Sequence, residues 1–328
     1  MPASRVKKIV VLRQGALGDV LVVRAAICFL RSAFPEAAVN LVAPGEKGRL
    51  FLRDGWADAV FNWESADFSW LFSDGDSEAP SRVKEVFNNA DLVVSYVDAA
   101  HSLFSVRLRS LAKEAACFLS PSRPSSDEVM RIDKWLVRNI VDFCFREGIL
   151  SSSFTHDMGK YISARIPFEV ATDQEVLVIH PGSGSGTKNW PIRHFVRLAQ
   201  LLLHKKCGVR PLCKLVVTSG EADGDLGERV CAGVPSATLW RGELAELAEL
   251  LAGCGMYIGN DSGVSHLASS VCGVGGSRPR IAVIFGPSDP RIWLPEGALL
   301  LEAGARMDAL DPETAFMHIK TMFSTEKA

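Results

Sequence analysis

The chain has 328 residues, of which 48% are hydrophobic and 23% are charged, and its formal net charge is −2. These values are ordinary for a globular protein, allow two domains with a large core, and exclude a general attraction to nucleic acid. The eight cysteines form no Cys-x-x-Cys pair, which favours a reducing cytoplasm and argues against a structural zinc ion.

The start of the chain lacks the hydrophobic region of a signal peptide. No apolar stretch reaches the ~20 residues that a membrane-spanning helix needs. We therefore expect a cytoplasmic protein whose contact with a membrane, if there is any, is peripheral.

The first half of the chain alternates short apolar runs with amphipathic segments. Residues 9–12 form a continuous apolar run, which is typical of a central parallel strand. The run ends in a turn at 13–19, and an amphipathic helix is expected to follow to about Phe34, where Pro35 ends it. We expect four further strands, at 39–42, 57–61, 91–95 and 115–119, a polar loop at 73–80, and a long helix from about Asp127 to Glu147.

Residues 150–174 show no clear period, so we interpret them as a connection between domains. A second series follows, with strands at 176–180, 214–218, 256–258 and 280–285 and helices at 243–254 and 312–323. Alternating strands and helices imply parallel sheets joined by right-handed crossovers. We therefore expect two α/β domains that bind ligands in a cleft at the carboxyl ends of both sheets.

A polar turn at 259–266 follows the third of these strands and precedes an apolar segment with helical spacing. Asp261 or Ser262 can cap the new helix, and Gly263 lets a ligand approach the backbone. The amides and the positive end of that helix would attract a phosphate. Taken alone, this turn is better explained as an ordinary capped helix.

A flexible stretch at 180–191 follows the first strand of the second series. Small residues such as Ser183 and Gly184 let backbone amides face a ligand, and Lys188 adds a positive charge. This combination suits phosphate oxygens, although the spacing of a Walker loop is absent. A surface loop is the alternative, which the rigid pair Trp190-Pro191 makes less attractive.

Three more polar residues have both a structural and a functional interpretation. Asp19, after the first strand, can cap a helix or accept a proton from an attacking hydroxyl. Glu221 can interact with a helix dipole or with ribose hydroxyls. His266 can be a buried structural histidine or a donor to a phosphate or sugar. The turn at 285–291, with two prolines, is expected to be structural.

Taken together and in order, these stretches resemble glycosyltransferase family nine, the ADP-heptose:lipopolysaccharide heptosyltransferases. The resemblance covers nearly the whole chain, and its motifs are specific as an ordered set but weak singly. They are Ile-Val-Val-Leu-Arg-x-x-x-Leu-Gly-Asp at 9–19, His-Pro-Gly-Ser…Lys-x-Trp-Pro at 180–191, Gly-Asn-Asp-Ser-Gly-x-x-His-Leu at 259–267 and Phe-Gly-Pro-Ser-Asp-Pro at 285–290.

The resemblance implies the GT-B fold, in which two Rossmann-like domains with parallel sheets face each other across a cleft. Residues 1–150 would bind the acceptor, 151–174 would connect the domains, 175–309 would bind the donor, and 310–328 would pack back on the first domain. The implied reaction is an inverting transfer without metal or cofactor. The implied partners are a nucleotide-sugar, ADP-heptose, and a lipopolysaccharide-core or related glycan.

The resemblance also implies roles for individual residues. Asp19 takes the place of the general base, Lys188 that of the phosphate-holding lysine, and Glu221 that of the acid near the ribose. Gly242 falls where the backbone contacts the base of the donor. The implied donor-binding residues are Ser183, Gly184, Lys188, Glu221, Gly242, Asp261, Ser262, Gly263 and His266.

The sequence departs from the family pattern in two places. Residues 95–101 lack the expected Asp-x-Gln/His pattern, which leaves the acceptor open, and 274–279 is longer than the usual link and affects a region near the donor turn. Arg107, Arg109 and Lys113 could meet an anionic acceptor or form a solvated helix face. An epimerase-like nucleotide-sugar enzyme of the same fold and a catalytically silent nucleotide-sugar-binding protein remain alternatives. A Rossmann oxidoreductase is disfavoured, because the dinucleotide fingerprint is absent.

Overall fold

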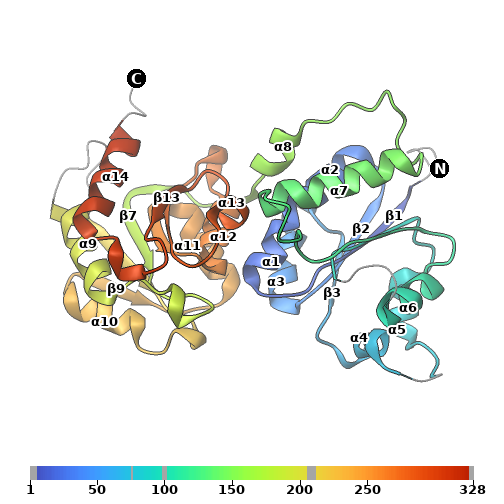
Figure 1. Ribbon diagram of the computed structural model, residues 1–328, viewed down its shortest axis with the longest axis horizontal. Helices are drawn as coiled ribbons and strands as arrows, with labels where there is room; N and C mark the ends of the chain where they lie inside the picture. Colours follow the sequence, from blue (N-terminus) through green and yellow to red (C-terminus); the bar gives the residue numbers. More distant parts are fainter. Residues whose placement is uncertain (1–5, 75–76, 98–101, 205–211, 325–328) are drawn as a thin grey trace. The chain divides into compact units, whose positions relative to one another are not determined.

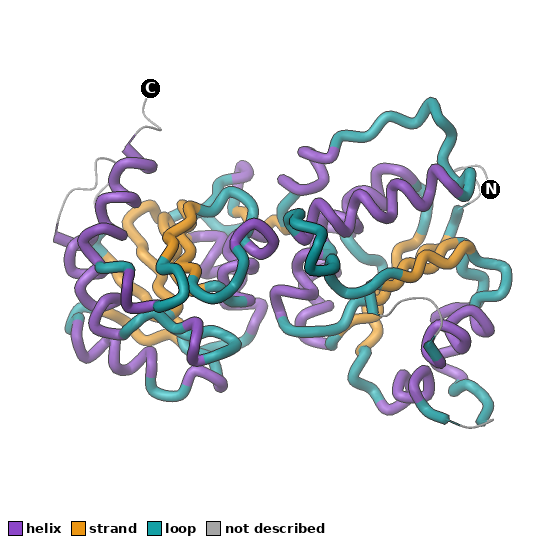
Figure 2. Tube along the Cα trace, in the orientation of Figure 1, coloured by secondary structure: helices purple, strands orange, loops and turns teal. Residues whose placement is uncertain are grey.

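The computed structural model describes residues 6–74, 77–97, 102–204 and 212–324. The chain divides into two compact units, Met1–Ile166 and Pro167–Ala328, and the division falls inside the connection expected at 151–174. In each unit a central layer of strands is flanked by helices (Figure 2). Among the described residues, we find no helix with the length and apolar character that crossing a membrane requires.

The first unit is built on a five-stranded parallel sheet in the order β3-β2-β1-β4-β5. The apolar side chains of Ile9, Val10, Val11 and Leu12 in the central strand have no exposed surface, as expected of a strand covered on both faces. All five strands lie close to the positions that the sequence predicts. They are β1 (Lys8–Leu12), β2 (Ala38–Ala43), β3 (Ala59–Asn62), β4 (Leu92–Ser95) and β5 (Ala116–Leu119).

Helices cover this sheet and form a small group beyond the ends of β3 and β4, where α4, α5 and α6 lie together (Figure 1). The long helix begins at Ile132 rather than near Asp127, because the segment before it folds back: Glu128 accepts a hydrogen bond from Trp135 Nε1 at 2.7 Å. The helices are α1 (Leu17–Val22), α2 (Arg24–Ala33), α3 (Gly45–Arg49), α4 (Ala66–Ser69), α5 (Ser81–Phe87), α6 (Leu103–Leu111), α7 (Ile132–Arg146) and α8 (Met158–Ser163), with 3-10 turns η2 (Leu50–Gly55) and η3 (Trp70–Phe72).

The second unit contains a six-stranded parallel sheet in the order β13-β12-β10-β7-β8-β9, the order of a doubly wound Rossmann sheet. The sequence analysis did not predict the edge strands β9 and β13, which have four residues each and are only partly buried. The strands are β7 (Asp173–His180), β8 (Lys214–Thr218), β9 (Ala237–Trp240), β10 (Cys254–Asn260), β12 (Arg280–Phe285) and β13 (Leu299–Glu302), besides the short β6 (Ile166–Pro167) and β11 (Val271–Cys272).

Loops, 3-10 turns and helices connect the successive strands of this sheet, and η7 and α14 follow the last strand, β13. The helices are α9 (Ile192–His204), α10 (Leu226–Gly233), α11 (Leu244–Gly253), α12 (Gly263–Ser270), α13 (Pro290–Trp293) and α14 (Pro312–Ser324). The 3-10 turns are η4 (Gly186–Lys188), η5 (Glu221–Asp223), η6 (Val274–Gly276) and η7 (Met307–Ala309).

The last helix, α14, packs within the second unit beside α9 and β13 (Figure 1). Its apolar residues Phe316, Ile319 and Phe323 lie in the core of that unit. These side chains are covered by the core of their own unit, whereas the expectation that 310–328 pack back on the first domain stays a prediction. Apolar spacing alone does not identify the neighbour that covers such a helix face.

We predict that Ile319→Ala lowers the free energy of unfolding of the second unit by about 2–5 kcal/mol, because it removes a fully buried side chain. Met317 lies on the same helix with 53% of its surface exposed, so Met317→Ala should change stability by no more than about 0.5 kcal/mol. Urea unfolding of both variants measures the difference. Equal stability of the two would contradict this placement of α14.

Candidate functional site

Most of the predicted binding residues lie on the carboxyl-terminal edge of the second sheet. Strand β10 pairs with β7 on one side, with Gly259 opposite His180, and with β12 on the other. The loops that follow β7 and β10 therefore begin side by side. This edge of a parallel α/β sheet is where such folds bind ligands.

Asn260, the last residue of β10, joins the two loops and is completely buried. Its side-chain Nδ2 donates to the carbonyl oxygen of Pro181 at 2.8 Å and to that of Gly182 at 3.4 Å, and its Oδ1 accepts from the backbone N–H of Trp190 at 3.0 Å. Both ends of the loop after β7 are thus held at the end of β10. The sequence analysis quoted Asn260 within a motif but gave it no role.

The loop between these ends exposes its backbone. Ser183 Oγ lies 2.6 Å from the carbonyl oxygen of Ser185 and 2.7 Å from Oδ1 of Asn189. The side chain of this predicted site residue therefore bonds to other residues of the loop and stabilises its conformation. Gly184 and Gly186 are exposed, and a methyl group added to either would meet nothing within 4 Å. There is therefore open space for a ligand to approach the backbone of this loop.

Lys188 and Asp261, which the sequence predicts to share a site, are brought together although 73 positions separate them. Lys188 Nζ donates to Asp261 Oδ2 at 2.8 Å. The Asp261 side chain is 9% exposed, whereas that of Lys188 is 34% exposed. The ammonium group is therefore both fixed by a buried carboxylate and open to solvent.

Asp261 leads directly into the first turn of α12. Ser262 caps this helix, because its Oγ accepts from the backbone N–H of Ser265 at 3.4 Å. Gly263 is the first helical residue, and His266 is a largely buried member of the same turn. The structure thus gathers Lys188, Asp261, Ser262 and Gly263 at two adjoining strand ends, with His266 one turn into the helix.

A buried polar group lies beneath the loop after β7. Nδ1 of His180 is 3.1 Å from Oγ1 of Thr218, and its Nε2 is 3.9 Å from Oδ2 of Asp223, which also accepts from the backbone N–H of Gly220 at 2.6 Å. Burial lowers the pKa of His180, and the negative charge of Asp223 opposes this shift. The hydrogen bond with Thr218 also opposes the shift, and the lowered pKa favours the neutral imidazole.

Asp223 also explains one of the glycines of this loop. A methyl group on Gly182 would lie 1.8 Å from Asp223 Oδ1, so any larger residue there requires the Asp223 carboxylate to shift. Sequence reasoning missed Asp223 and selected its neighbour Glu221. Nothing in the sequence distinguishes the two acids, because their difference in burial arises from packing.

Two predicted donor-binding residues stand apart from the Lys188–Asp261 pair. Glu221 and Gly242 follow the adjoining strands β8 and β9, and both are exposed. Within the part of the chain that the structure describes, neither bonds to Lys188 or Asp261. Their placement on the same edge of the sheet leaves their proposed contacts with a nucleoside open to test.

The predicted base, Asp19, lies in the first unit on the first turn of α1. Its Oδ2 accepts from the backbone N–H of Ala16 at 3.1 Å, and its Oδ1 is 3.4 Å from the Arg13 guanidinium. Arg13 is completely buried and also donates to the carbonyl oxygen of Ser122 at 2.7 Å. Burial lowers the pKa of Arg13, and the negative charge of Asp19 opposes this shift. Because arginine keeps its proton in proteins, Arg13 is a charged partner of Asp19. The sequence pattern assigned it no role.

The Asp19 carboxylate is held in place and remains 35% exposed. Gly15, four residues before Asp19, has φ +118°, and a methyl group there would lie 2.8 Å from Asp19 Oδ2. The strand-to-helix turn therefore presents an oriented carboxylate to solvent, which fits the predicted role of a proton acceptor.

The basic cluster on and just after α6 divides into structural and exposed residues. Arg107 is buried, donates to the carbonyl oxygen of Trp70 at 2.6 Å and lies 4.3 Å above the ring of Trp70, so it supports packing. Arg109 and Lys113 are exposed. The unusual stretch after β4 cannot be compared in full, because 98–101 lie outside the described residues.

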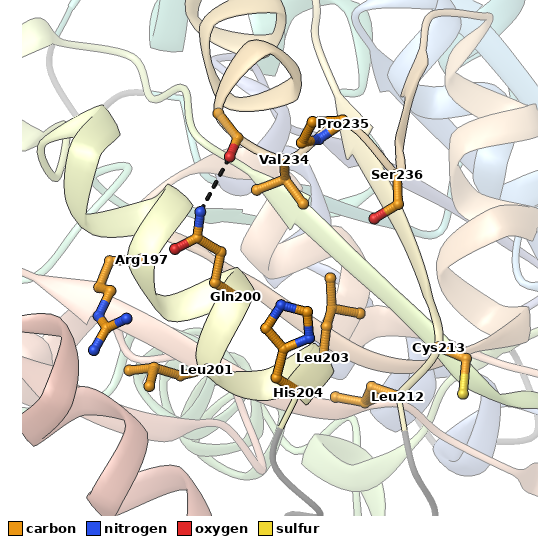
Figure 3. Close-up of a pocket in the computed structure, with 11 residues that line it drawn as sticks. Arg197, Gln200, Leu201, Leu203, His204, Leu212, Cys213, Val234, Pro235 and Ser236 are labelled. Atoms are coloured by element: carbon orange, nitrogen blue, oxygen red, sulfur yellow. Dashed lines mark hydrogen bonds between the residues drawn. The ribbon is translucent and has the colours of Figure 1, made fainter.

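Two cavities lie elsewhere in the units. One of about 640 Å³ is at the opposite, amino-terminal edge of the second sheet, between α9 and the link from α10 to β9, where Gln200 Nε2 donates to the Gly233 carbonyl at 3.2 Å (Figure 3). The other, of about 710 Å³, lies between β5 and α7 of the first unit and includes Arg109. Neither contains a predicted donor-binding residue. Among the described residues, no three His, Cys, Asp or Glu side chains gather in a way that could hold a metal ion.

Comparison with known proteins agrees with this fold. Residues 146–305 match the model of glycosyltransferase family 9 (heptosyltransferase), so the second unit carries a domain of this family. The match includes the loop after β7, the turn into α12 and every strand of the six-stranded sheet. The resemblance drawn from the motifs is confirmed for this part of the chain.

Among individual proteins, lipooligosaccharide heptosyltransferase 2 of Haemophilus influenzae is 27% identical over 131 residues, which are 38% of this chain and 34% of that protein. The matched stretch is thus about a third of the curated relative. A family 9 glycosyl transferase from Veillonella parvula is similar in structure, with a TM-score of 0.70 at 16% identity over 96% of this chain and 97% of that one.

The Escherichia coli heptosyltransferase WaaC, solved with ADP, has a TM-score of 0.65 at 15% identity over 98% of this chain and 100% of that one. These likenesses confirm the predicted fold class: the chain has the α/β fold of the GT-B heptosyltransferases, with parallel sheets.

We predict that Gly182→Ala destabilises the second unit by about 1–3 kcal/mol, because the new methyl group must displace the buried Asp223 carboxylate. Gly184→Ala, two residues along the same loop in open space, is the matched control and should stay within about 0.5 kcal/mol of the parent protein. Chemical unfolding followed by fluorescence compares them. Identical unfolding curves would show that the loop does not lie against Asp223.

Proposed function

We propose that this protein is an inverting, metal-independent glycosyltransferase that moves a heptose from ADP-heptose to a lipopolysaccharide-core or related glycan acceptor. The observation that carries this proposal is the Lys188–Asp261 pair beside the first turn of α12, next to the open backbone of the loop after β7. The family match of the second unit and the heptosyltransferase names of its relatives support the same class of reaction.

The donor is held by its diphosphate. Lys188 supplies a partly exposed positive charge, the backbone around Ser183 and Gly184 supplies accessible amides, and Ser262 and Gly263 begin a helix whose positive end favours an anion. His266 donates to a phosphate or sugar hydroxyl from the same turn. Glu221 contacts the ribose, and the backbone at Gly242 contacts the base.

The transfer is a single in-line displacement. The oxygen of an acceptor hydroxyl bonds to the anomeric carbon while the bond from that carbon to the diphosphate oxygen breaks, and the diphosphate leaves with the electron pair. Asp19 takes the proton of the hydroxyl, with its carboxylate oriented by Arg13 and by the amide of Ala16. Lys188 and the amides stabilise the charge that develops on the leaving group. One displacement inverts the configuration at the anomeric carbon.

The setting of the reaction follows from its substrates. Nucleotide-sugars are cytoplasmic metabolites, and the acceptor implied by the family is attached to lipid. We therefore place the protein in the cytoplasm, in peripheral contact with the inner membrane. The ADP in the WaaC structure supports an adenine nucleotide as donor, and a thermal-shift screen with ADP-, UDP-, GDP- and TDP-sugars tests this choice. A rise in the thermal unfolding midpoint with a UDP-, GDP- or TDP-sugar in place of the ADP-sugar would overturn the choice of an adenine nucleotide.

We predict that Lys188→Ala weakens ADP binding about tenfold or more, because a charge-assisted contact to the diphosphate is lost. Lys214→Ala is the matched control, since Lys214 lies in the same unit and also pairs with an aspartate, Asp173, at 2.8 Å. Isothermal titration calorimetry should find parent-like affinity in the control. Equal affinity in both variants would remove Lys188 from the donor site.

We predict that Asp19→Asn reduces transfer at least about a hundredfold and leaves ADP affinity unchanged, because the amide cannot accept the proton. Asp58→Asn is the control, since Asp58 is also bonded to an arginine, Arg31, and to a backbone N–H in the first unit. Turnover is measured with donor and membrane glycolipid. Full turnover by Asp19→Asn would refute its role as base, and donor turnover without any acceptor would favour an epimerase-like reaction.

A further inference from the structure

We infer that Asn260 is a positioning residue that sets the distance between the two halves of the donor site. This distance in turn makes the site bind a nucleoside diphosphate more tightly than a nucleoside monophosphate. The inference rests on the proposed function, because it concerns the same nucleotide-binding surface. The halves are the loop after β7, residues 181–190, and the first turn of α12, residues 261–266.

The side chain of Asn260 fixes the first half. It donates to Pro181 O and Gly182 O where the loop begins and accepts from the Trp190 N–H where it ends. A primary amide is the one uncharged side chain group that offers both donors and an acceptor in this way. Because the residue is completely buried, water cannot replace these bonds.

The backbone of the same residue fixes the second half. The carbonyl oxygen of Asn260 accepts from Ser265 Oγ at 2.6 Å, and this hydroxyl is also 3.0 Å from the phenolic oxygen of Tyr257. All three residues are buried. The first turn of α12 is thereby held against the end of β10, and Asp261, the next residue, holds Lys188 from the loop.

Both anion-binding segments therefore take their position from one residue. A diphosphate can engage both segments at once only if their separation matches that of its two phosphoryl groups, whereas a monophosphate needs one segment. Loss of the Asn260 bonds loosens the hold of the β10 end on these segments, so this residue no longer fixes their separation. The affinity for ADP should therefore fall more than the affinity for AMP, because the contact that is lost is the one to the second phosphoryl group.

The experiment compares the ratio of the dissociation constants of AMP and ADP among variants, by isothermal titration calorimetry. Asn260→Asp keeps the size and the acceptor but removes both donors, and it should lower the ratio about tenfold by weakening ADP while AMP binding is retained. Because the loss of buried bonds can prevent folding, Ser265→Ala provides a milder second variant. It leaves the Asn260 side chain in place, removes the hydroxyl that links the Asn260 carbonyl oxygen to the phenol of Tyr257, and should lower the ratio in the same direction.

Ser270→Ala is the matched control. Ser270 is a buried serine of the same helix whose Oγ donates to the His266 carbonyl oxygen at 2.7 Å, away from the Asn260 bonds. It should lower the unfolding midpoint and keep the parent ratio. A parent-like ratio in Ser265→Ala, or an equal loss of AMP and ADP affinity, would overturn the spacing role. A parent protein that binds neither nucleotide would overturn the proposed function instead, and the spacing role with it.

Discussion

The pairing of β10 with β7 is the constraint on which the site of the second unit depends. This register places Gly259 opposite His180, so the two strands end at the same position along the sheet and the loops that follow them begin side by side. Lys188, at the far end of one loop, can then reach Asp261, at the start of the other. A shift of the register by one residue would turn every side chain of β10 to the other face of the sheet and separate the partners of Asn260.

Polar side chains that are buried beneath the site hold its exposed parts in place. Asn260, Ser265 and Tyr257 support the loop and the turn from below, and His180 and Asp223 lie under the glycine that starts the loop. Buried polar groups are costly unless they are bonded, so each additional bond narrows the conformations that the loop can adopt. The result is a rigid base below an open, glycine-rich surface, an arrangement suited to binding an anion by backbone amides.

In the first unit, a charged side chain holds the proposed catalytic turn in place. A completely buried arginine, Arg13, anchors the turn that carries Asp19, while the carboxylate itself stays partly exposed. The arginine has several backbone carbonyl partners, so it orients the turn as a whole as well as the side chain. In both units, therefore, a buried polar residue near the end of a central strand positions the groups proposed to meet substrate.

The sequence by itself determined the strands with long apolar runs, such as β1 and β7, and the ordered motifs that identify the family, because apolar runs, turn residues and motif spacing are local properties. Through the family resemblance it also assigned Lys188 and Asp261 to one donor site, and the structure joins their side chains by a hydrogen bond. Only the tertiary structure decided that α14 is covered by the second unit, that Asp223 lies under Gly182, and that Asn260 joins segments 70 and more positions away. These contacts depend on which elements pack together, and periodicity within an element does not specify its neighbour.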